Sequence, residues 1–186
     1  MVNLDPFFFP FTALLLMIVP LQWLGAAFAA AVIHELCHIL TILLLGGQIQ
    51  NIKVGLGKAE IEAKISGNLQ EILCAIAGPL GSILLICLRH CFPRIALCGV
   101  VQGLFNLLPI YPLDGGRVLY CSLALAVPEY ADSIFNHICN CFLCLFIILS
   151  ILGCLYLKSG PIPILISLHL ARNRKKTCKQ CRIGIQ

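Results

Sequence analysis

Charged residues are scarce in this chain. Only 11% of its 186 residues are Asp, Glu, Lys or Arg, whereas about a quarter is usual in a soluble globular domain. Four long stretches contain none of them: residues 6–33, 72–88, 95–113 and 133–157. A helix needs about 20 predominantly apolar residues to cross a bilayer. The lack of charge therefore excludes an ordinary soluble domain and predicts a multi-pass membrane protein.

The uncharged stretches predict a mainly α-helical fold with about six transmembrane helices. We expect helices over about 6–20, 22–45, 69–89, 95–111, 134–157 and 161–171, with a short additional helix ending near residue 126. The last segment is short for a span and needs help from its flanks to cross. Five spans is therefore the alternative count.

The segment between the second and third predicted helices has a different pattern. Apolar residues alternate with polar ones at Ile52, Val54 and Leu56, and again from Ile61 onward, with Gly57 near the reversal. A period of two around a glycine is typical of a β-hairpin. We therefore predict a small membrane-associated β-hairpin over about 48–66; a solvated loop is the alternative interpretation.

Basic residues are concentrated near the C-terminal end. Residues 172–182 carry six Lys or Arg and no acid, and basic segments beside a span stay in the cytoplasm. Six spans put this tail, the predicted hairpin and both termini in the cytoplasm, although Arg89 and Arg94 then fall on the far side. The chain divides into a membrane domain over 1–171 and a basic cytoplasmic tail over 172–186. Such a tail favours anionic lipid headgroups over nucleic acid as its partner.

Twelve cysteines do not predict a disulfide framework in this chain. Most of them fall in the uncharged helices, where a free cysteine behaves as a small hydrophobic residue. Cys178 and Cys181 form a C-x-x-C pair in the tail, but a structural zinc site needs four ligands and no second pair has suitable spacing. We therefore expect mostly reduced thiols.

Two histidines and a glutamate lie within the second predicted helix. Residues i and i+4 are about 40° apart around a helix, so His34 and His38 can present two nitrogens to one point. Glu35 lies about 100° from His34, beside a metal ion rather than on it. This is the H-E-x-x-H arrangement of zinc peptidases. At bilayer depth each ionisable group costs about 2.5–3.5 kcal/mol on insertion scales, which favours a functional role over packing.

A catalytic zinc ion needs a third protein ligand. Asp114 directly follows an apolar stretch, whereas the other acids lie at the terminus, in polar segments or near the ends of spans. Pro109, Pro112 and Gly115-Gly116 predict an interrupted helix around it. Irregular backbone at membrane depth is tolerated where it is buried in protein or lines a wet cavity. We therefore predict Asp114 as the third ligand; a plain turn between two helices is the alternative.

Three short motifs follow one another along the chain: His34-Glu35-Leu36-Cys37-His38, then Asn106-x-x-Pro109, then Leu113-Asp114-Gly115. Over roughly residues 20–120 this set resembles the site-2 protease family of intramembrane zinc metalloproteases. The size and the lack of an inserted PDZ-like domain resemble its sporulation stage IV FB-type branch, here without a C-terminal CBS domain. Ser82, in the stretch 77–82, stands where the family commonly has asparagine.

The resemblance implies one Zn²⁺ per chain, held by His34, His38 and Asp114. Glu35 would be the general base, and Asn106 is a candidate to orient the substrate or stabilise the oxyanion. The implied substrate is a membrane-associated protein segment, such as that of a pro-sigma factor, cut in a bacterial cell membrane. Membrane regulatory or inhibitory partners are implied as well, and no nucleic acid.

Two other classes of protein share part of this pattern: a second type of membrane peptidase, and a non-enzymatic membrane protein such as a silent homologue or a metal transporter. A prenyl-protein-type membrane peptidase also has H-E-x-x-H but takes a later glutamate as a ligand, and Glu129 falls in an expected loop. A catalytically silent membrane zinc-binding homologue would have lost Glu35. A metal transporter would carry ionisable groups on several helices.

Overall fold

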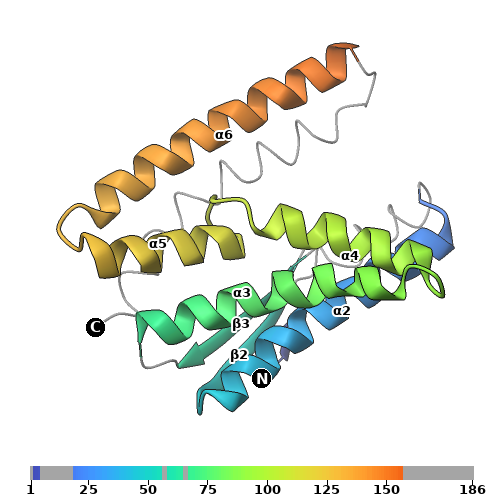
Figure 1. Cartoon of the computed structure of the whole chain (residues 1–186), viewed down its shortest axis with the longest axis horizontal. Coiled ribbons are helices and arrows are strands. Elements are labelled where there is room, and N and C mark those ends of the chain that lie inside the picture. Colours follow the sequence, from blue (N-terminus) through green and yellow to red (C-terminus); the bar gives the residue numbers. More distant parts are fainter. Residues whose placement is uncertain (1, 5–18, 56–57, 65–66, 157–186) are drawn as a thin grey trace. The chain divides into compact units, whose positions relative to one another are not determined.

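The computed structural model describes residues 2–4, 19–55, 58–64 and 67–156, and the chain divides into two compact units, residues 1–106 and 107–186 (Figure 1). The first unit contains a small sheet and four helical segments: α2 (Leu21–Leu44), α3 (Asn68–Leu84), the short 3₁₀ helix η1 (Leu85–Leu88) and α4 (Pro93–Asn106). The second unit contains α5 (Asp114–Ala126) and α6 (Ala131–Tyr156).

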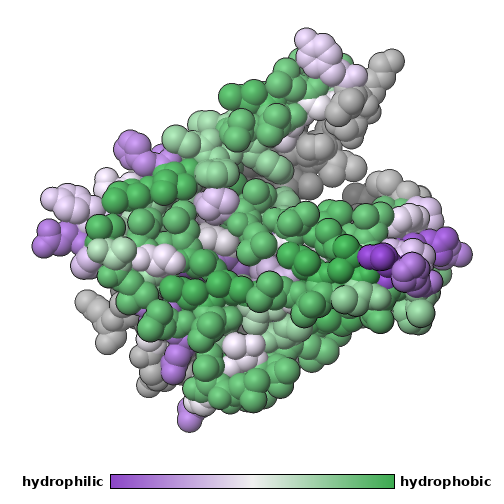
Figure 2. Space-filling view, in the orientation of Figure 1, coloured by the Kyte–Doolittle hydropathy of each residue, from purple (hydrophilic) through white to green (hydrophobic). Residues whose placement is uncertain are grey.

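Within the described ranges, three helical segments are long and apolar enough to cross a membrane: Leu21–Leu44, Asn68–Leu88 and Ala131–Tyr156. They match the second, third and fifth predicted helices. Many of their large apolar side chains are exposed, for example Leu36 at 54% and Leu40 at 58% on α2, and hydrophobic residues cover most of the face in Figure 2. Water disfavours so much exposed apolar surface, which suits contact with lipid. The described residues therefore belong to a membrane protein.

The fourth predicted helix ends earlier than expected. A continuous helix over 95–111 was the prediction, whereas α4 ends at Asn106 and the next residues form turns. The residue before a proline disfavours the helical conformation, so Pro109 explains the stop. With 14 residues, α4 is shorter than the about 20 needed for a span.

The count of six spans stays a prediction. The predicted helices over 6–20 and 161–171 lie outside the described residues, apart from Val19 and Pro20, which are not helical. The basic tail over 172–186 also lies outside them. The ten cysteines in the described part of the chain are free thiols.

The sheet of the first unit has three strands in the order β1 (Val2–Leu4), β2 (Gln48–Gly55) and β3 (Lys58–Lys64). β2 and β3 are antiparallel, with Ile52 opposite Ile61, and they lie within the segment predicted as a hairpin. β1 pairs with β2 in parallel. Three residues are too few to show an alternating pattern, so β1 was not predicted.

Small side chains line the helix contacts of the first unit. α2 packs against α3 and α4, and it buries every fourth residue: Ala26, Ala30, His34, His38 and Ile42. The facing helices contribute mainly small residues: Cys74, Ala75, Gly78, Pro79 and Ser82 from α3, and Ala96, Gly99 and Gly103 from α4. Small residues let membrane helices approach closely. Both imidazoles therefore lie on the packed face of α2 rather than on the lipid side.

In the second unit, two glycines fix how the chain enters α5. A Cβ atom on Gly115 or Gly116 would collide with the backbone of the turn that precedes the helix. The same turn accepts a hydrogen bond from α6, because the Cys139 thiol lies 3.2 Å from the carbonyl oxygen of Pro109. This close packing sets the position of Asp114, the first residue of α5.

Candidate metal centre

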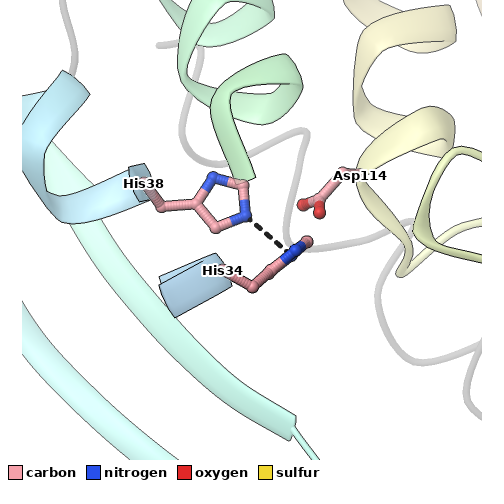
Figure 3. A group of neighbouring side chains, drawn as sticks. All are labelled: His34, His38 and Asp114. Carbon is pink, nitrogen blue, oxygen red and sulfur yellow. Dashed lines mark hydrogen bonds between the residues drawn. The ribbon is translucent and has the colours of Figure 1, made fainter. Parts of the chain in front are cut away.

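α2 places two histidines next to each other. His34 and His38 are one helical turn apart and only 2% and 7% exposed, and their Nε2 atoms are 3.2 Å apart (Figure 3). Two nitrogens that bind one tetrahedral zinc ion at about 2.0–2.1 Å would be about 3.3–3.4 Å from each other. The pair therefore has the separation of two ligands of one metal ion.

The other ring nitrogen of each histidine is held by α3. Nδ1 of His34 lies 2.8 Å from Oγ of Ser82, and Nδ1 of His38 lies 2.7 Å from the carbonyl oxygen of Cys74. A carbonyl oxygen only accepts, so His38 donates from Nδ1, and its neutral ring carries a lone pair on Nε2. Histidines that bind metals usually donate their second N–H in this way. The hydrogen bonds thus suit metal binding at Nε2.

Glu35 follows His34 on α2 and is partly exposed. One residue along a helix corresponds to a rotation of about 100°, so its carboxylate leaves the helix beside the imidazole pair. It is therefore placed near the ring nitrogens without replacing either of them. A carboxylate in that position can accept a proton from water close to the metal.

Asp114 belongs to the second unit, where it is the first residue of α5 and 8% exposed. Its carboxylate is one of three candidate metal-binding side chains in the described part of the chain, and the other two are the imidazoles of His34 and His38 (Figure 3). Two imidazoles and one carboxylate are a known donor set of catalytic zinc sites. The residues present therefore fit zinc in type and number.

Two further residues considered from the sequence lie at a helix end and in a turn. Asn106 is the last residue of α4 and is partly exposed. Glu129, the ligand that a prenyl-protein-type peptidase would need, is exposed in the turn between α5 and α6. A buried metal ligand is not expected at an exposed position in such a turn.

Sequence reasoning missed two residues of α3 that adjoin the imidazoles. Ser82 is completely buried and contacts His34. A Cβ atom on Gly78 would run into the imidazole ring of His38. The available signal was their spacing, because residues i and i+4 share one face of a helix.

Gly78→Ala should weaken zinc binding by the histidine pair. The added methyl group occupies the space of the His38 ring, which must then turn away from its position next to His34. Loss of a hydrogen bond that orients a ligand lowers metal affinity by about 10–100-fold. Displacing the ligand itself should lower the affinity at least as much. Gly25→Ala, also in a helix, is the matched control because its Cβ meets nothing within 4 Å. Wild-type zinc affinity in Gly78→Ala would contradict this account of the site.

Comparison with known proteins gives a consistent result. The family described as Peptidase M50B-like matches residues 10–113. The chain is 35% identical over 108 residues to a Synechocystis protein named as a zinc metalloprotease, an alignment that covers 50% of this chain and 28% of that protein. It is 26% identical over 180 residues to stage IV sporulation protein FB of Bacillus subtilis, covering 88% of this chain and 60% of that protein. The chain thus spans less than two thirds of either relative.

A solved structure shares the fold. The site-2 protease from Methanocaldococcus jannaschii superposes with a TM-score of 0.68 at 22% sequence identity. The superposition covers 94% of this chain and 89% of that one. At this level of identity the likeness supports the arrangement of the backbone.

Proposed function

Because the chain belongs to the Peptidase M50B-like family, we propose that it is an intramembrane zinc metalloprotease that hydrolyses a peptide bond in or near a membrane-associated segment of a protein. One observation carries the proposal: on a helix long enough to span a membrane, two buried imidazoles face each other at 3.2 Å and Glu35 follows directly. The names of the relatives, a zinc metalloprotease and a site-2 protease among them, support it.

The proposed centre holds one Zn²⁺ per chain through Nε2 of His34, Nε2 of His38 and a carboxylate oxygen of Asp114. The donor set and the hydrogen bonds at both Nδ1 atoms support this assignment. When bound, zinc lowers the pKa of a water molecule to about 7 and polarises a carbonyl group. The burial of both imidazoles keeps bulk water away from these nitrogens.

Glu35 is the proposed general base. It accepts a proton from the attacking water and later delivers it to the nitrogen of the leaving amine. Asn106 is proposed to hold the substrate or to donate a hydrogen bond to the developing oxyanion. Its position at the end of α4, directly before the turn that leads to Asp114, supports this role.

The sheet offers a place for the substrate to become extended. A peptide bond within a helix is shielded, so a helical substrate must unwind before hydrolysis. Among the strands that the structure describes, β2 lies between β1 and β3, and β3 pairs with β2 alone. We propose that an extended substrate segment adds to the outer edge of β3 by β-augmentation.

Proline at one of two adjacent positions of β3 should lower cleavage without removing zinc. Successive backbone N–H groups of a strand point to opposite edges, so Glu60→Pro and Ile61→Pro remove one donor toward β2 and one toward the outer edge. The variant that loses the outer donor should cleave slowly and keep its zinc, because His34 and His38 are untouched. Cleavage rate and zinc content are measured on the same samples, and undiminished cleavage by both variants would refute substrate pairing at β3.

The proposed substrate is a membrane-associated pro-sigma factor in a bacterial cell membrane, with both termini of the chain in the cytoplasm. Similarity to stage IV sporulation protein FB along 88% of this chain supports the choice. The test is co-expression of the full chain with a tagged pro-sigma-type substrate, followed on a gel. Cleavage with the wild type and none with Glu35→Gln is the expected result. Equal cleavage with both would point to a host protease and reject the proposal.

A further inference from the structure

The two imidazoles of the proposed centre are held by different kinds of acceptor. His38 bonds to a backbone carbonyl, which any residue at position 74 would supply. His34 bonds to a side chain, the hydroxyl of Ser82 at 2.8 Å. Only the second contact depends on the identity of a residue outside the H-E-x-x-H motif.

Ser82 is fixed in place by its surroundings. Its side chain is fully buried, and α4 packs directly against it. A Cβ atom added to Gly99 would lie 2.6 Å from the carbonyl oxygen of Ser82, and one added to Gly103 would lie 3.2 Å from its Cβ. The two glycines therefore let α4 approach until the backbone of Ser82 cannot shift. Its hydroxyl faces the imidazole as a rigid partner.

We propose that Ser82 is a positioning residue of the metal centre, and this inference rests on the proposed function. A hydroxyl can donate or accept, so Ser82 keeps its bond to Nδ1 of His34 in either tautomer of the ring, and with a metal bound at Nε2 the hydroxyl oxygen accepts from Nδ1–H. With the proton held on Nδ1, the lone pair of the neutral ring lies on Nε2, the atom that faces His38. The bond also sets the rotation of the ring about its side-chain torsions, and without a metal the two Nε2 atoms share a hydrogen bond at 3.2 Å, in which Nε2 of His34 donates to Nε2 of His38.

Loss of the hydroxyl should weaken metal binding. In Ser82→Ala the Nδ1 atom loses its partner on α3, and the ring can turn. Losing the partner of a metal-binding histidine typically costs about 10–100-fold in affinity, and we expect a loss of that size. Ser82→Thr keeps the hydroxyl and should bind zinc close to the wild-type level.

The experiment measures the zinc dissociation constant of the full-length chain in detergent by competition with a chromogenic chelator. Ser150→Ala is the matched control, because Ser150 is 5% exposed and its hydroxyl donates to the carbonyl oxygen of Phe146 at 2.7 Å. It removes a buried hydroxyl from a membrane helix without touching an imidazole. The thermal midpoint of each metal-free variant is recorded in parallel and should be similar for the two alanine variants.

The outcomes separate this inference from the proposed function. Weak zinc binding in Ser82→Ala alone supports the role of Ser82. Wild-type affinity in Ser82→Ala overturns it and leaves the metalloprotease proposal intact. An equal loss in Ser150→Ala or in Ser82→Thr shows a general packing effect and also overturns it. If the wild-type chain bound no zinc, both the role of Ser82 and the metalloprotease proposal would be contradicted.

Discussion

Replacing Glu35 with glutamine is expected to lower the rate of peptide hydrolysis by about 10²–10⁴-fold, the usual contribution of general acid–base catalysis. Glutamine has nearly the same shape, but its carboxamide does not accept a proton from water. The zinc content should stay at the wild-type level, because Glu35 is not among the proposed ligands. The measurement is kcat on a membrane-anchored substrate, with zinc determined in the same preparation.

Glu129→Gln is the control for this substitution. It makes the same chemical change at an exposed turn position and should alter neither kcat nor zinc content. It also tests the prenyl-protein-type alternative, in which loss of Glu129 would release the metal. Wild-type turnover by Glu35→Gln would contradict the assignment of Glu35 as the base.

Asp114→Asn is expected to produce the largest loss of zinc outside the histidine pair. A carboxylate becomes a neutral carboxamide, which is a much weaker zinc ligand than the carboxylate oxygens found in such sites. Loss of a contact that orients a ligand lowers metal affinity by about 10–100-fold. Loss of the ligand itself should lower the affinity for zinc by more than that, and cleavage should disappear with it. Zinc stoichiometry after exhaustive washing is the measurement.

Asp132→Asn is matched to Asp114→Asn in its position on a helix. Asp114 lies in the first turn of α5 and Asp132 in the first turn of α6. Both substitutions remove a negative charge that stabilises a helix N-terminus by about 0.3–1 kcal/mol. Asp132→Asn should therefore show the structural cost alone and keep its zinc. If Asp114→Asn retained zinc equally well, another residue would have to be the third ligand.

The features that the sequence predicted best depend on short-range periodicity. The spacing of His34 and His38 is enough to place both imidazoles on one face of α2. The uncharged stretches predicted the bounds of α2, α3 and α6 to within a few residues of those observed. The prolines and glycines around Asp114 indicated an interrupted helix, and the structure has turns followed by α5 there.

Most of the features that were missed depend on contacts between distant segments. β1 pairs with a strand about 50 residues away, and such pairing leaves no local pattern. Ser82 and Gly78 adjoin the imidazoles only because of the way in which α3 is rotated against α2, which a single sequence does not specify. The end of α4 at Asn106 could have been predicted, because Pro109 disfavours a helical residue before it.

The most direct test of the central claim is removal and return of the metal. The purified chain is reconstituted in lipid vesicles with the pro-sigma-type substrate, treated with a zinc chelator, washed, and supplied again with Zn²⁺. Cleavage should stop on chelation and return with zinc in the wild type, while Glu35→Gln stays inactive throughout. Undiminished cleavage after complete removal of zinc would contradict the claim that this chain is a zinc metalloprotease.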